Sequence, residues 1–186
     1  MSAYHVMLVH FPIALWTTAF LLILARSLSG APLVRAAEGA LTPLLALGAL
    51  SGWAAFAAGL LVWPMEAVAS SPLARNHLLL VAWSLAYWTL LWLVRWRAGE
   101  RVWEGMSRWI MLVLAALGVG LQTLTGTIGG YLAGNPSAVS EIVRRLGWEV
   151  FTTFYLPTWM LAVVVAAALI LAALGFAGRR ATARRA

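Results

Sequence analysis

The chain alternates long apolar stretches with short connections that carry most of its arginines. Five of these stretches approach or exceed the roughly 20 residues that a helix needs to cross the hydrocarbon core of a bilayer. They are residues 4–25, 40–65, 76–94, 109–131 and 155–176. They lack the alternation of apolar and polar positions that is typical of barrel strands. The pattern therefore predicts an all-α fold, a polytopic transmembrane helix bundle of about five spans.

The composition also indicates a protein that lies in a lipid bilayer. Of 186 residues, 63% are hydrophobic and only 10% are charged, and the mean hydropathy is +0.89. A soluble domain is about half apolar and about a quarter charged. We expect one transmembrane domain over residues 1–178, followed by a basic tail at residues 179–186. The lipid bilayer is its first expected partner.

The positions of the arginines predict the orientation. The chain has 13 basic residues, all of them Arg, and ten of these fall in the first loop, the third loop and the tail. The other three are Arg75, Arg144 and Arg145. The positive-inside rule then places the N-terminus outside and the C-terminus in the cytoplasm. We therefore attribute the net charge of +7 to arginines that set the orientation in the membrane, and no nucleic-acid partner is expected.

A polar segment separates the fourth and fifth apolar stretches. Asn135 followed by Pro136 is typical of a helix start. Apolar residues then recur at helical spacing with charged residues largely between them. This predicts an external amphipathic helix over residues 136–150, lying on the outer membrane surface. A lid over a site and a docking surface for a partner are the alternatives.

Small residues form a stripe on each of two predicted spans. The second span has Gly48, Gly52, Ala55 and Gly59, and the fourth has Gly118, Gln122, Gly126, Gly130 and Gly134. Such stripes let membrane helices approach closely, so we expect both spans at the bundle centre, backbone against backbone. Room for a planar cofactor is the alternative. Gln122 is expected to make a buried hydrogen bond.

Tryptophans gather near the predicted span ends. They are Trp63, Trp96, Trp103, Trp109 and Trp148. Tryptophan is enriched at membrane interfaces, where its ring sits among the headgroups. We therefore expect these five side chains to anchor the helices at the interface.

The three histidines are the candidate functional residues. The predicted topology places His5, His10 and His77 in one layer near the outer face. Two imidazoles from two helices at one depth are what a low-spin b-type haem requires. His5 and His10 differ by roughly 140° around their helix, so a pair across helices is easier. We predict His10 and His77 as axial ligands of haem b iron, with His5 in reserve. The alternative is that they only bind headgroups or backbone.

The absence of certain residues and motifs excludes several other kinds of functional site. With no Cys, disulfides, iron–sulfur clusters, thiolate zinc sites and covalent haem attachment are excluded. No nucleophile elbow, Walker loop or zincin motif is present in the sequence. We therefore do not expect the chain to be an enzyme by itself.

The opening run HVMLVHFPIALW, from His5 to Trp16, resembles a bacterial membrane family known as domain-of-unknown-function family 2231. That family begins with a pattern like HPxxVHFPIAL; here Val9 to Leu15 match and Val6 replaces the proline. His77 and the GGYL segment at residues 129–132 are similar to later family features. The resemblance, over residues 4–134, implies a polytopic inner-membrane protein. Its relatives' association with c-type cytochromes favours haem b and redox work.

Two hypotheses follow. In the first, the chain is a b-type haem electron-transfer subunit whose partners are a periplasmic cytochrome c or quinone. In the second, it is a non-catalytic membrane scaffold or assembly subunit without a cofactor, and its partners are other membrane subunits.

Overall fold

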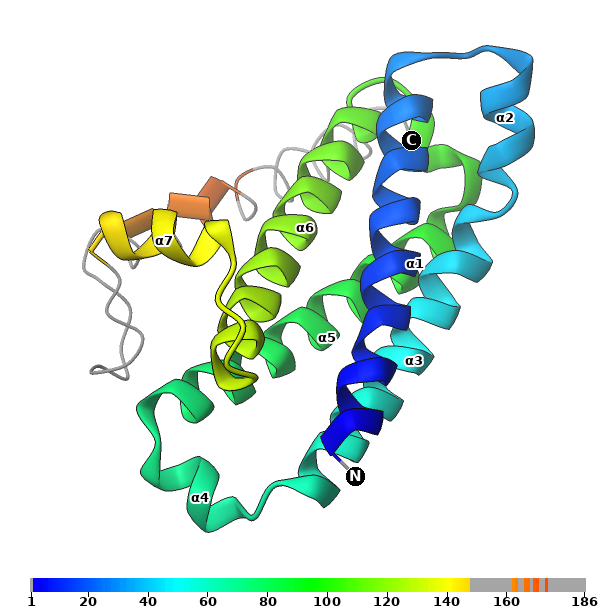
Figure 1. Cartoon of the computed structure of the whole chain (residues 1–186). Helices are drawn as coiled ribbons and strands as arrows, with labels where there is room; N and C mark the ends of the chain where they lie inside the picture. Colours follow the sequence, from blue (N-terminus) through cyan, green and yellow to red (C-terminus); the bar gives the residue numbers. More distant parts are fainter. Residues whose placement is uncertain (1, 148–161, 164–165, 168, 171–172, 174–186) are drawn as a thin grey trace.

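The computed structural model describes residues 2–147, 162–163, 166–167, 169–170 and 173 (Figure 1). The helices are α1 (Ser2–Leu28), α2 (Pro32–Glu38), α3 (Leu41–Val62), α4 (Met65–Ser70), α5 (Pro72–Ala98), the 3₁₀ helix η1 (Gly99–Trp103), α6 (Ser107–Leu132) and α7 (Ala138–Arg145). The described part of the chain contains no strand. The expected all-α fold class is confirmed there.

Four of the described helical segments have the length and hydropathy of membrane spans. They are Tyr4–Leu28, Pro32–Val62, Pro72–Trp103 and Ser107–Leu132. These correspond to the first four predicted spans, with ends that differ by up to nine residues. The second is longer than expected because α2 precedes α3, starting from a proline at its first turn. Of the fifth predicted span, residues 155–176, only seven residues are described, so this span and the orientation stay predictions.

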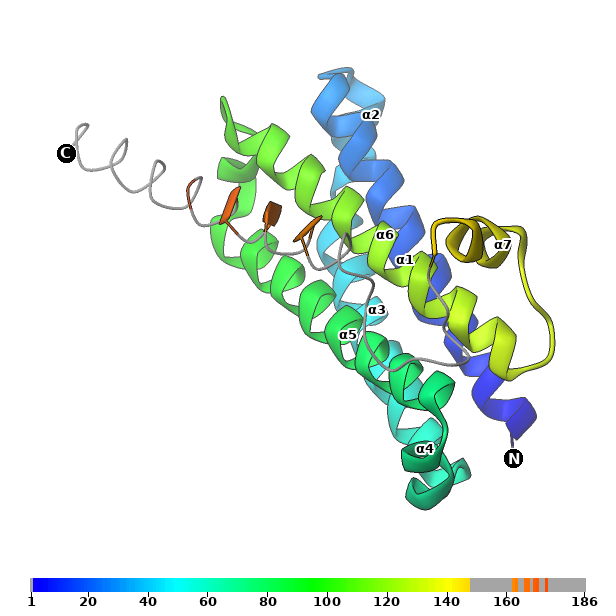
Figure 2. The same ribbon diagram turned by 90° about the vertical axis from the view of Figure 1, so that its left-hand side faces the viewer.

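The four long helices form a bundle in which each packs against two others. α1 packs against α3 and α6, and α5 packs against the same two helices (Figures 1 and 2). α1 and α5 therefore lie diagonally opposite each other, as do α3 and α6. Side chains from the two diagonal helices meet at the centre of the bundle.

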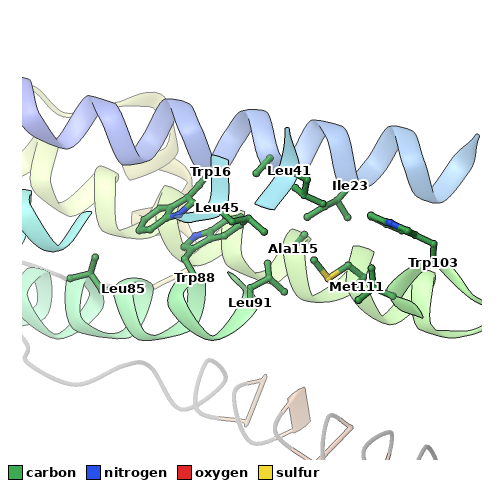
Figure 3. Packing of buried hydrophobic residues seen from close by; sticks show 12 residues of the cluster. Trp16, Ile23, Leu41, Leu45, Leu85, Trp88, Leu91, Trp103, Met111 and Ala115 are labelled. Carbon is green, nitrogen blue, oxygen red and sulfur yellow. The ribbon is translucent and has the colours of Figure 1, made fainter. Parts of the chain in front are cut away.

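A stacked pair of indoles fills that centre (Figure 3). The rings of Trp16 and Trp88 lie 5.3 Å apart with 7° between their planes. A Cβ on Gly48 would lie 2.4 Å from Trp16 Nε1, and one on Gly118 would lie 2.9 Å from Trp88 Cζ2. The glycines thus give space to tryptophans from α1 and α5. The expected packing of backbone against backbone is wrong at these positions, because indole rings occupy the space between the helices.

Buried charges join the helices at the end of the bundle where α2 lies. Glu38 accepts hydrogen bonds from Arg26 Nε (2.9 Å), from Arg95 Nη2 (2.7 Å) and from the indole N–H of Trp103. Arg95 also contacts the exposed Glu100 at 3.0 Å. We call these five residues the Glu38 cluster. Since Glu38 and Arg95 are 5% and 7% exposed, the cluster is an interior feature that joins α1, α2, α5 and η1.

The interfacial tryptophans divide into two groups. Trp63, Trp96 and Trp109 are 40–61% exposed, as membrane anchors would be, and Trp148 lies outside the described residues. Trp103 is only 8% exposed. Its expected role as an anchor is wrong, because its N–H donates to Glu38 and two guanidinium groups lie over its ring.

α7 is shorter than the helix expected over residues 136–150. It begins at Ala138 and ends at Arg145, and residues 148–150 lie outside the described part. It packs against α6 beside the bundle (Figure 1). Glu141 accepts hydrogen bonds from Arg144 and Arg145 on one face, and Ile142 is 57% exposed. A helix is present over Ala138–Arg145; the amphipathic helix over residues 136–150 and its place on the outer surface stay predictions.

Candidate functional site

His5 lies near the start of α1 and points toward α3. Its Nδ1 is 3.0 Å from the carbonyl oxygen of Ala55. Because a carbonyl only accepts hydrogen bonds, Nδ1 carries the proton and Nε2 keeps a free lone pair. The ring covers Gly59, where a Cβ would lie 2.9 Å from His5 Cε1. The small residue therefore lets the imidazole lie flat against α3.

His77 lies in the second turn of α5, on the opposite diagonal helix. The helix begins with a cap in which Ser71 Oγ accepts from the Ala74 amide at 3.3 Å. The His77 ring covers Gly129 of α6, with Cε1 3.0 Å from the position of a Cβ there, and it faces the backbone of Thr125. Its Nδ1 is buried and makes no hydrogen bond to another described group. One ring nitrogen is thus available in the interior.

His5 and His77 lie on the diagonal helices α1 and α5, toward the same end of the bundle. Each ring lies against a glycine of a neighbouring helix, and the two rings are within range of a long-range electrostatic interaction. His10 differs: its side chain is exposed and its Nδ1 bonds to the carbonyl of Val6, one turn earlier in α1, at 2.7 Å. Of the residues predicted as ligands, His77 and the reserve His5 are therefore partly buried against neighbouring helices, and His10 is exposed.

Two supporting groups were not predicted. The Ala55 carbonyl that orients His5 is a backbone atom, and no sequence pattern identifies it. Gly129 belongs to the GGYL segment, not to the stripe through Gly126 and Gly130, so the stripe alone did not single it out. Gln122 behaves as expected, since its Nε2 donates to Ile13 O at 3.3 Å and Thr17 Oγ1 at 3.2 Å.

The donor set is a pair of imidazoles. Among the described residues, no group of three or more His, Asp or Glu side chains is placed to hold a metal ion. Two neutral imidazoles are the axial donors of a bis-histidine haem, whose macrocycle supplies the other ligands. No protein-family model, curated protein or solved structure matches this chain. The resemblance to family 2231 therefore stays a prediction.

Proposed function

We propose that this integral membrane protein binds one haem b between His5 of α1 and His77 of α5, and that it passes electrons between a periplasmic cytochrome c and the quinone pool. The observation that carries the proposal is that these two imidazoles, from diagonal helices at the same end of the bundle, each lie against a glycine and are within range of a long-range electrostatic interaction. The outer location follows from the predicted orientation.

The surroundings of His5 suit a metal ligand. The hydrogen bond from Nδ1 to the Ala55 carbonyl fixes the ring and leaves Nε2 to face the metal. Such a partner on the far nitrogen is the usual support of a ligating histidine, and it raises the basicity of the ligand. His77 contributes a buried Nδ1 without a described hydrogen-bond partner. When bound, haem b supplies reversible one-electron transfer at its iron.

The test is a dithionite-reduced minus oxidised visible spectrum of the detergent-purified protein, with a pyridine haemochrome assay for stoichiometry. We expect a sharp α-band and one haem b per chain. His5→Ala and His77→Ala should each lose this spectrum. His10→Ala should keep it, because the His10 ring is exposed and bonded within its own helix. Circular dichroism and size exclusion check that each variant is folded.

The same experiment distinguishes the proposed ligands from the alternative pair, His10 and His77. If His10→Ala loses the spectrum and His5→Ala keeps it, the ligands are His10 and His77. If the unsubstituted protein is colourless after expression with ample haem, the proposal fails. A scaffold without cofactor is then the better account.

A further inference from the structure

Three buried polar side chains lie at neighbouring levels of the packed helices α5 and α6, near the middle of both. They are Ser84, Trp88 and Gln122, which are 4%, 0% and 8% exposed. Trp88 Nε1 and Gln122 Oε1 make no hydrogen bond to another group in the described part of the chain. A buried polar atom without a partner is destabilising, so these two atoms call for a hydrogen-bonding ligand.

The register of the two helices places these groups together. Trp88 faces Gly118, and His77 faces Gly129. These contacts are eleven residues apart on each helix, and the helices run in opposite directions. Ser84, one turn before Trp88 on α5, therefore lies opposite Gln122, one turn after Gly118 on α6. Residues four apart share one face of a helix, so all three side chains border the same small region.

Their hydrogen-bonding capacities are complementary to one molecule. Trp88 offers a donor, and Gln122 Oε1 offers an acceptor. Thr125 Oγ1 gives its proton to the Leu121 carbonyl at 2.8 Å, so the 2.8 Å contact between Ser84 and Thr125 hydroxyls uses the proton of Ser84. Ser84 Oγ is then left as an acceptor. The region presents one donor and two acceptors.

We propose that a water molecule is bound inside the membrane core between Trp88, Gln122 and Ser84. It accepts one hydrogen bond from the indole N–H and donates to Gln122 Oε1 and to Ser84 Oγ. Buried waters typically make about three such bonds. The site is independent of the haem proposal. It lies two turns inward from His77 along α5, and it extends a line of polar groups from that histidine toward the bundle centre.

The first test is NMR of the full chain in detergent micelles with ¹⁵N-labelled tryptophan, with the Trp88 peak assigned by its loss in Trp88→Phe. We expect a cross-peak between the Trp88 indole N–H and water. Trp16 is the matched control, because its Nε1 is also buried without a described partner but faces Gly48 of α3. Its indole N–H should show no such cross-peak. Absence of the water cross-peak at Trp88 would overturn the proposal.

The second test uses pairs of substitutions and the thermal midpoint of unfolding. Trp88→Phe and Ser84→Ala each remove one bond to the same water, so the double variant should lose less than the sum of the single losses. Trp16→Phe combined with Ser84→Ala should lose the full sum. Equal additivity in both pairs would refute a shared water. If Trp88→Phe does not fold, the water cross-peak of the unsubstituted chain, assigned through the backbone, decides alone.

Discussion

Glu38 is a single acidic side chain that satisfies three donors in the interior. Both carboxylate oxygens accept from guanidinium groups, and the Trp103 indole donates as well. Removing one partner of a buried ion pair leaves an uncompensated charge, which costs more than the pair itself contributes. In Glu38→Ala, Arg26 and Arg95 lose this counter-charge.

We therefore expect Glu38→Ala to lower the free energy of unfolding by about 3–5 kcal/mol. Unfolding of the detergent-solubilised protein by a denaturing detergent measures it. Glu100→Ala is the matched control, because Glu100 also contacts Arg95 but is 73% exposed, and exposed pairs contribute about 1 kcal/mol or less. Equal losses in the two variants would contradict the role given to Glu38.

The sequence identified the histidines but not the Glu38 cluster. Three His in a chain this apolar stand out, and the predicted topology alone puts them in one layer. Glu38 lies just before a predicted span, where a charged loop residue is ordinary. Arg26 and Arg95 belong to the arginines that predict the membrane orientation. Their meeting depends on how α2 and η1 fold back on the bundle, and no local pattern encodes that contact.

The glycines of α3 and α6 differ in their structural roles. A Cβ on Gly48 would lie 2.4 Å from Trp16 Nε1, whereas no atom of the described residues lies within 4 Å of a Cβ on Gly126. Trp16 is held in place by its stack on Trp88, so it cannot move aside freely. We expect Gly48→Ala to destabilise the bundle by about 1–3 kcal/mol, as overpacking does.

Gly126→Ala serves as the control for this substitution. Alanine is favoured over glycine inside a helix by about 0.5–1 kcal/mol, so this variant should be neutral or slightly more stable. The thermal midpoints of both variants in one detergent give the comparison. A loss at Gly126 as large as that at Gly48 would mean that the exposed face of α6 is covered.

α7 provides a prediction for pH. Hydrogen bonds from Arg144 and Arg145 lower the pKa of Glu141 from its ordinary value of 4.5 to about 2. The ion pairs therefore support the helix fully above pH 4.5, and this support is lost as the pH falls from 4.5 through 2. The ¹³C shift of the Glu141 carboxyl carbon should titrate with a midpoint of about 2.

The control replaces both arginines with glutamine. The midpoint should then return toward 4.5, because the carboxylate loses the donors that stabilise its charge. A midpoint near 4.5 in the unsubstituted chain would mean that solvent dissolves these exposed pairs.

The long helices were predictable because a helix that crosses the bilayer must be apolar over about 20 consecutive residues, and a pattern of that length is visible in the sequence. The short ones were not, since α2, α4 and η1 have 7, 6 and 5 residues and carry too few positions to show a period. The sequence also could not predict how each helix is rotated about its own axis. This rotation decides that His5 packs against α3 whereas His10 is exposed.

The orientation of the whole molecule decides which compartment the histidine pair faces. In the predicted topology, ten of the 13 arginines fall on the side of the C-terminus, and the positive-inside rule predicts that this side is cytoplasmic. His5 and His77 then lie toward the periplasm. This end of the bundle also holds the connection through α4, and the Glu38 cluster lies at the other end.

Reporter fusions test this arrangement and the fifth span together. Alkaline phosphatase, active only outside, should be active when fused after Gly134. Green fluorescent protein, fluorescent only in the cytoplasm, should fluoresce when fused after Gly105 and also after Ala186. Fluorescence at Gly105 with phosphatase activity at Ala186 would mean that residues 155–176 do not cross the membrane. Reversal at all three positions would place His5 and His77 toward the cytoplasm, and a periplasmic cytochrome would no longer be within reach of the pair.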